Sequence, residues 1–169
     1  MIQLNVLFGS PVIVLLAVSV VLSGLMAGFF FAYSSSVVLA LETLSASEYV
    51  TVMQEINDKV LNVVFGAVFF GAVVVPIVGT VLLLLRGTWA TQYGQLFFAG
   101  MVIYLVGTFF VTIRIHIPMN DHIATWSPTS PPDEWASVRA RWRRWNHVRT
   151  TAAVISFMLY LVAIVSFRL

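Results

Sequence analysis

Two stretches of the sequence place histidine, asparagine and arginine side chains at the edge of an apolar segment. They are His116, Asn120 and His122 in the first stretch, and Asn146, His147 and Arg149 in the second. Imidazoles can transfer protons near neutral pH or ligate a metal, while amide and guanidinium groups donate hydrogen bonds to anions. Polar and ionisable side chains at the depth of a membrane are costly to bury and are therefore functional candidates. The two stretches predict one site, provided that the fold brings them together.

The elements that must position these side chains are apolar segments. Of the 169 residues, 60% are hydrophobic and 9% are charged, and no charged residue occurs in 1–41, 60–85, 87–113 or 150–167. So few charged side chains cannot cover a globule in water, which excludes a soluble enzyme. A span of the hydrocarbon core needs about 20 residues, and the predicted spans are about 11–41, 60–85, 94–116 and 149–167. The sequence predicts an all-α integral membrane up-and-down four-helix bundle, with residues 1–169 as a single four-span domain.

The segments 42–59 and 117–148 join the first span to the second and the third to the fourth, so they lie at the same end of the predicted bundle. All seven carboxylates lie in these segments, and the three histidines lie in them or at their edges. We call the two segments the interfacial polar cap. The positive-inside rule places this cap in the cytoplasm of a bacterial cell whose cytoplasmic membrane holds the spans. The expected partners are membrane lipids and a hydrophobic small molecule rather than nucleic acid, and the oligomeric state stays open.

Local signals predict where the elements begin and end. Ser45 and Glu48 form a capping-box pattern, which predicts an interfacial helix that runs into the second span. Pro118 predicts that the third span stops near Ile117, because proline disfavours helical conformation in the residue before it.

Other functions are compatible with the same residues. Two histidines and a carboxylate can bind iron, and two histidines from different helices can ligate a haem, so any metal would use His116, His122 or His147. No histidine pair has the spacing of a helical metal site, and we therefore predict no metal or other cofactor. The tryptophans and arginines of the cap are also typical interfacial anchors. A non-enzymatic scaffold or lipid-binding subunit is thus the alternative to an enzyme, beside a haem or metal protein that uses His116 and His147.

Four motifs spread along the chain resemble those of the anthrone oxygenase-like family of small four-span membrane proteins. The motifs are Gly28-Phe-Phe-Phe-Ala-Tyr33-Ser-Ser-Ser36, Met53-Gln-Glu-Ile-Asn57 with Asn62 and Phe65, His116-Ile-Pro-Met-Asn120, and Trp142-x-x-Trp145-Asn146-x-x-Arg149. The third motif often reads Asn-x-Pro-Leu-Asn in the family, and here His116 occupies its first position.

The resemblance implies that an aromatic polyketide of the anthrone type is oxygenated to a quinone without a conventional cofactor. A base would remove a ring C–H proton, and the resulting anion would react directly with O₂. His116 or His147 is the expected base, and the expected oxyanion donors are Asn120, Asn146 and Arg149. The expected substrate-binding residues are Phe30, Tyr33, Ser34, Asn62, Trp142 and Trp145, with Phe29 and Phe31 beside them.

Overall fold

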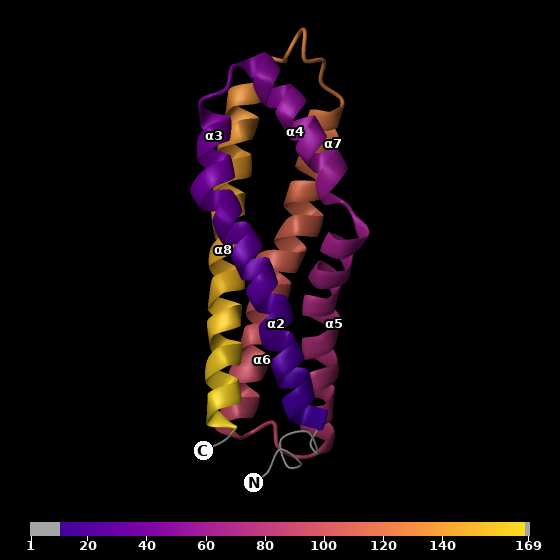
Figure 1. Ribbon diagram of the computed structural model, residues 1–169, viewed down its shortest axis with the longest axis vertical. Coiled ribbons are helices and arrows are strands. Elements are labelled where there is room, and N and C mark those ends of the chain that lie inside the picture. Colours follow the sequence, from indigo (N-terminus) through magenta and orange to yellow (C-terminus); the bar gives the residue numbers. More distant parts are fainter. Residues whose placement is uncertain (1–10, 168–169) are drawn as a thin grey trace.

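The computed structural model describes residues 11–167 as an elongated bundle of helices, and no strand occurs in that range. Successive long rods run in opposite directions (Figure 1). Each rod is long and apolar enough to cross a membrane, and the rods are Pro11–Glu42, Val63–Leu85, Gln92–Ala124 and Trp135–Ser166. The predicted all-α four-span bundle is confirmed, and the chain is a membrane protein.

The first rod consists of α2 (Pro11–Ala32), a π-helical turn η1 (Tyr33–Val37) and α3 (Val38–Glu42). After it, α4 (Ala46–Val60) lies across the polar end of the bundle (Figure 1). The Ser45 backbone N–H donates to the Glu48 carboxylate at 2.9 Å, and the Ser45 side chain accepts from the Glu48 backbone. The capping box predicted from the sequence is therefore confirmed.

The sequence predicted that the helix after the capping box runs into the second span, and this prediction is wrong. The chain leaves the helical conformation at Leu61, and α5 (Val63–Leu85) begins as a separate helix. Asn62 Oδ1 accepts a hydrogen bond from the Phe65 backbone N–H at 3.0 Å, which satisfies one of the free donors at the start of α5. The asparagine cap thus separates the interfacial helix from the membrane span.

The third rod does not end near Ile117, as was predicted from Pro118, but continues as a helix to Ala124. It consists of α6 (Gln92–Tyr104), π-helical turns η2 (Leu105–Phe110) and η3 (Thr112–His116), and α7 (Ile117–Ala124). Pro118 lies in the first turn of α7, directly after η3, and at this position a proline is tolerated. The fourth rod, α8, covers Trp135–Ser166, so much of 117–148 is helical.

Three apolar clusters fill the interior from one end of the bundle to the other. The cluster furthest from the cap joins all four rods through residues such as Leu16, Leu83, Phe97 and Tyr160. The middle cluster surrounds Phe30 and Phe69, and the third packs the cap through Tyr49 and Trp142. The candidate polar residues lie between the middle cluster and the cap.

Candidate functional site

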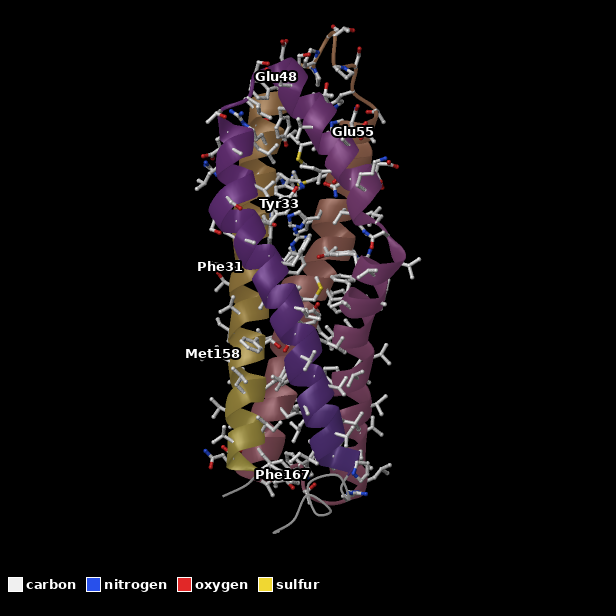
Figure 2. The ribbon with its side chains drawn as sticks, in the orientation of Figure 1. Phe31, Tyr33, Glu48, Glu55, Met158 and Phe167 are labelled. Atoms are coloured by element: carbon white, nitrogen blue, oxygen red, sulfur yellow. The ribbon has the colours of Figure 1, made fainter. Side chains whose placement is uncertain are left out.

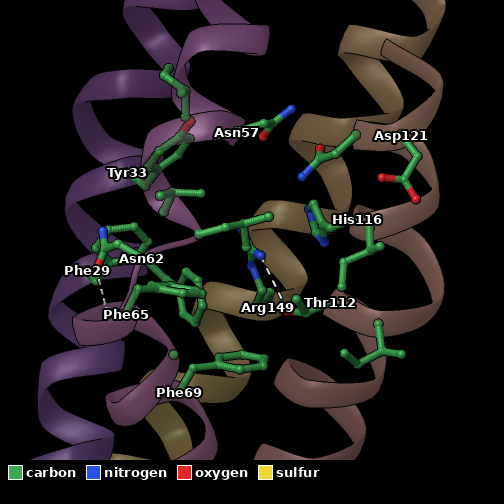
Figure 3. A pocket seen from close by; sticks show the side chains of 18 of the residues that line it. Phe29, Tyr33, Asn57, Asn62, Phe65, Phe69, Thr112, His116, Asp121 and Arg149 are labelled. Atoms are coloured by element: carbon green, nitrogen blue, oxygen red, sulfur yellow. Dashed lines mark hydrogen bonds between the residues drawn. The ribbon is translucent and has the colours of Figure 1, made fainter. Parts of the chain in front are cut away.

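A cavity of about 370 Å³ lies inside the bundle where the spans meet the cap. Aromatic side chains from α2 and α5 form one wall, and Figure 3 shows them facing His116 and Arg149 across the space. The polar lining comes mainly from the third rod and α8, which face that wall, and from α4. The principal lining residues are Phe29, Phe30, Tyr33, Asn57, Phe65, Phe69, Thr112, His116, Asn120, Trp142 and Arg149.

Arg149 is the charged group at the centre of the site. Its side chain enters the bundle from α8, the residue is only 7% exposed, and Nη2 donates to Asn146 Oδ1 at 2.6 Å. Nη1 donates to Thr112 Oγ1 at 3.4 Å, the bond drawn in Figure 3. Its Nε has no hydrogen-bond partner, and within residues 11–167 no carboxylate forms an ion pair with this guanidinium. A buried cation without a counter-charge is costly, so the site favours an anionic group in the cavity.

Aromatic rings complete the surroundings of that cation. The guanidinium carbon of Arg149 lies 4.2 Å from the ring centroid of Phe30 and 6.0 Å from that of Trp142. Such contacts stabilise a cation through the negative face of the ring without neutralising its charge. The guanidinium therefore keeps its attraction for an anion in the cavity.

His116, on the third rod, lies beside Arg149 of α8 (Figure 3). It is 1% exposed, and neither ring nitrogen has a hydrogen-bond partner of normal geometry in the described chain. Its ring packs edge-on against Trp142, with the centroids 5.0 Å apart. The buried imidazole thus has ring nitrogens available to a molecule in the cavity, which makes His116 the candidate base of the site.

The third rod presents polar groups to the cavity at intervals of four residues, from Thr112 through His116 to Asn120. The amide oxygen of Asn120 accepts from Trp142 Nε1 at 2.9 Å, which fixes both side chains. Across from them, Asn57 of α4 has a buried Nδ2 without a hydrogen-bond partner. π-Helical turns often occur at functional sites, and here η3 carries three of the lining residues, Thr112, Ile113 and His116.

Asn146, a predicted oxyanion donor, forms hydrogen bonds to protein groups next to the cavity. It is fully buried, does not line the cavity, and donates from Nδ2 to Ser34 Oγ at 2.8 Å. Ser34 Oγ lies 2.8 Å from Thr150 Oγ1, which in turn donates to the Phe30 carbonyl at 3.1 Å. This network ties α2 to α8, and the Asn146 amide oxygen accepts from Arg149.

Several other predicted residues lie outside the cavity. His147 is exposed, so it does not share a space with the buried His116, and Trp145 is half-buried away from the lining. His122 lies on the outside and interacts with Glu134 Oε1 at 2.8 Å. Phe31 is 60% exposed and points away from the bundle, whereas Tyr33 points inward (Figure 2). In the described part of the chain, no three histidine or carboxylate side chains are grouped to hold a metal.

Phe69 and Thr112 line the cavity but were missed as site residues. Phe69 stacks with Phe65, one turn before it, at a centroid distance of 5.5 Å. Their spacing of four residues places both rings on one face of a helix, which is the signal that the sequence offered. Thr112 had a similar signal, because it lies four residues before His116. Asn62, which was also predicted, lines the cavity, and both ends of its amide are engaged: Oδ1 accepts from the Phe65 N–H at the start of α5, and Nδ2 donates to the Lys59 carbonyl near the end of α4.

The comparison with protein families gives one match. The model of the family described as Anthrone oxygenase matches residues 61–159, which is more than half of the chain. The matched range includes His116, Asn120, Trp142 and Arg149. No curated protein and no solved structure matches.

Proposed function

The chain belongs to the anthrone oxygenase family and is an oxygenase-like membrane protein, and on this premise we propose that it oxygenates a hydrophobic aromatic ketone of the anthrone type in the cavity. The volume supports this class of ligand, because pockets for small organic ligands measure about 300–1,000 Å³. The ring-lined wall of α2 and α5 suits a flat fused-ring molecule.

The observation that carries the proposal is the pair of unsatisfied groups, His116 and Arg149, on one side of an aromatic cavity. A base next to an unpaired cation is the arrangement that removal of a proton from carbon requires, because the electron pair left behind becomes an anion. In an anthrone, this anion is an aryl oxide whose negative charge lies largely on the ketone oxygen. Arg149 would hold that oxygen, and Asn57 and Asn120 line the same space.

The proposed reaction uses O₂ as the only oxidant. His116 takes one proton from the ring CH₂ group, the carbanion carbon forms a bond to O₂, and proton return gives a hydroperoxide. Loss of the second C–H proton then breaks the O–O bond, which forms the new C=O group and expels hydroxide. Hydroxide and a proton leave as water, so an anthrone and O₂ become a quinone and water. The chemistry balances without a bound cofactor.

We also propose that the cap faces the cytoplasm of a bacterial cell. This proposal is supported by the distribution of basic residues, because among residues 11–167 only Arg86 lies at the end of the bundle opposite the cap. The substrate would then be taken from the membrane, and lipids would surround the rods. Because the chain has no cysteine, single cysteines introduced at the exposed positions Ser47 or Ala90 can report the sidedness with impermeant reagents.

Two histidine variants test the proposed site. His116→Ala should lower the rate of anthrone oxidation by about 10²–10⁴-fold, the usual contribution of a general base. His147→Ala is the matched control, because His147 is exposed and outside the cavity. The measurement is O₂ consumption together with quinone absorbance, in nanodiscs and at equal protein content. Equal rates for both variants would contradict the role of His116, and a Soret band in the purified protein would favour the haem hypothesis.

A further inference from the structure

A second hollow lies on the outer surface of the bundle, next to the cavity. This groove has a volume of about 800 Å³ and is lined mainly by apolar side chains of α2 and α5, including Leu25, Val64 and Val68. Several residues line both the groove and the inner cavity, so the two spaces are neighbours across a single layer of side chains. The shared residues are Phe29, Tyr33, Ile56, Val60, Asn62 and Phe65.

The course of the helices explains why the bundle is hollow at this level. Figure 1 shows α2 close to α5 at the end remote from the cap and running diagonally toward α8 at the polar end. The interruption of the helix at Leu61 and Asn62 adds to the divergence, because it separates α5 from α4. A wedge therefore opens between α2 and α5 toward the cap, and it faces the region where lipid surrounds the spans.

Two glycines of α5 show where the wedge begins. An added Cβ at Gly71 would lie 3.2 Å from Leu22 of α2. One turn or so closer to the cap, an added Cβ at Gly66 would meet no atom within 4 Å. The helices are thus tightly packed below this level, and unfilled space begins at it.

Two aromatic rings form the boundary between groove and cavity. The rings of Phe29 and Phe65 are 5.5 Å apart at their centroids and tilted by 55°. Phe29 is 37% exposed, which is unusual for a ring that also lines an internal cavity. In Figure 3 these two rings lie on the side of the cavity opposite His116. Side-chain rotation can widen such a boundary, because Phe29 is already partly exposed and both rings also line the outer groove.

We propose that the groove is the access site for the aromatic substrate, which leaves the bilayer between α2 and α5 and passes Phe29 and Phe65 into the cavity. This inference rests on the proposed function for the class of ligand. The groove binds the flat apolar rings of a membrane-dissolved molecule, and the two phenylalanines offer stacking contacts on both sides of the boundary. Asn57 and Asp121 line the cavity toward the cap, so the polar mouth is a less suitable path for an apolar ketone.

Single cysteines test this route, since the native chain has none. Val64→Cys places a thiol in the groove, Val78→Cys places one on the same helix outside it, and Ala124→Cys places one at the polar mouth. Each variant is compared before and after reaction with a bulky maleimide. The probe is 1,8-dihydroxyanthraquinone, which is a fused-ring analogue of the product. Its association with protein in nanodiscs is followed by stopped-flow quenching of tryptophan fluorescence.

We expect the label at position 64 to slow association by about tenfold or more, which corresponds to a barrier higher by about 1.4 kcal/mol. The label at position 78 should leave the rate within experimental error. If the label at position 124 slows association and the label at position 64 does not, the lateral route is overturned and the proposed function stands. If the probe does not bind to the unlabelled native protein, the ligand class of the proposed function is wrong and the route falls with it.

Discussion

The two ends of the bundle differ in how their apolar helices meet. At the end remote from the cap, an added Cβ at Gly79 or Gly100 would lie 2.7 Å from the ring of Phe97 or Tyr160. At the polar end, an added Cβ at Gly66 meets no atom within 4 Å. Glycine therefore has opposite uses in one fold: it lets helices approach closely in the closed half, and it leaves space in the half that holds the cavity.

Buried polar groups without a partner occur in both halves of the described chain, but only some of them face a cavity. In the closed half, Ser156 Oγ donates to the Gly100 carbonyl at 2.8 Å, while Tyr160 Oη has no partner and packs among apolar side chains. In the other half, Arg149 Nε and both nitrogens of His116 have no partner, and both residues line the cavity. The difference teaches that a buried polar group without a partner is available to a ligand only where the helices leave space beside it.

The largest expected effect is the removal of the unpaired cation. Arg149→Met should lower kcat/KM for anthrone oxidation by about 10²–10³-fold, the usual loss for one group that stabilises an oxyanion. Arg144→Met, an exposed arginine on the same helix, is the matched control. Kinetics in nanodiscs and thermal unfolding of both variants separate chemistry from folding. Full activity of Arg149→Met would remove the anion site from the mechanism.

The second expected effect concerns the closed half. Gly100→Ala should lower the free energy of unfolding by about 1–3 kcal/mol, the usual cost of overpacking. The new methyl group would meet the Tyr160 ring at 2.7 Å and the Ser156 carbonyl oxygen at 3.3 Å, and the backbone atom cannot rotate away. Unfolding in a titration with sodium dodecyl sulfate measures the change. A variant as stable as the native protein would show that the helices in this half are not closely packed.

The third prediction makes the matched substitution in the other half. Gly66→Ala should not destabilise the protein, because alanine favours a helix by up to about 1 kcal/mol over glycine. Its free energy of unfolding is compared directly with that of Gly100→Ala. Gly66→Leu should instead fill the cavity and weaken binding of 1,8-dihydroxyanthraquinone by about tenfold, or roughly 1.4 kcal/mol. Equilibrium quenching of tryptophan fluorescence gives the affinity. Unchanged affinity of Gly66→Leu would place the ligand elsewhere.

Much of the fold followed from the distribution of charge, because charge-free stretches of span length leave few alternatives to membrane helices. The boundaries at Leu61 and Pro118 did not follow. An asparagine before an apolar run is a helix cap only if the chain bends there, and a proline ends a helix only if the preceding turn is regular. At Pro118 the π-helical turn η3 changes the register, which no local pattern in the sequence announced.

The site was predicted in part, and helical phase explains the difference. His116, Asn120 and Arg149 were predicted and line the cavity, but His147 was chosen with them and is exposed. Successive residues of a helix point about 100° apart, so His147 cannot share the inward face of Asn146. The groove between α2 and α5 was beyond prediction, since it depends on the angle at which two apolar helices diverge.

The smallest expected effect concerns the roof of the cavity, where α4 contributes Ile56 and Asn57 to the lining. The hydrogen bonds from Ser45 to the Glu48 carboxylate hold the pKa of that carboxyl below its ordinary value of 4.5. The ionised form is thus the one that the folded cap favours. Its contribution to stability is complete above the unfolded pKa and is lost as the pH falls through the lower folded pKa.

Glu48→Gln should therefore make the start of α4 fray slightly at neutral pH, and the difference from the native protein should shrink as the pH is lowered below 4.5. Hydrogen exchange of the amides in residues 46–50 measures this, with Glu55→Gln, exposed on the same helix, as the control. Exchange in the closed half, around Gly100, should not change, because α4 packs against other parts of the cap, among them α7. Faster exchange in both halves would mean that the cap and the closed half unfold as one unit, and the division between them would then be one of packing alone.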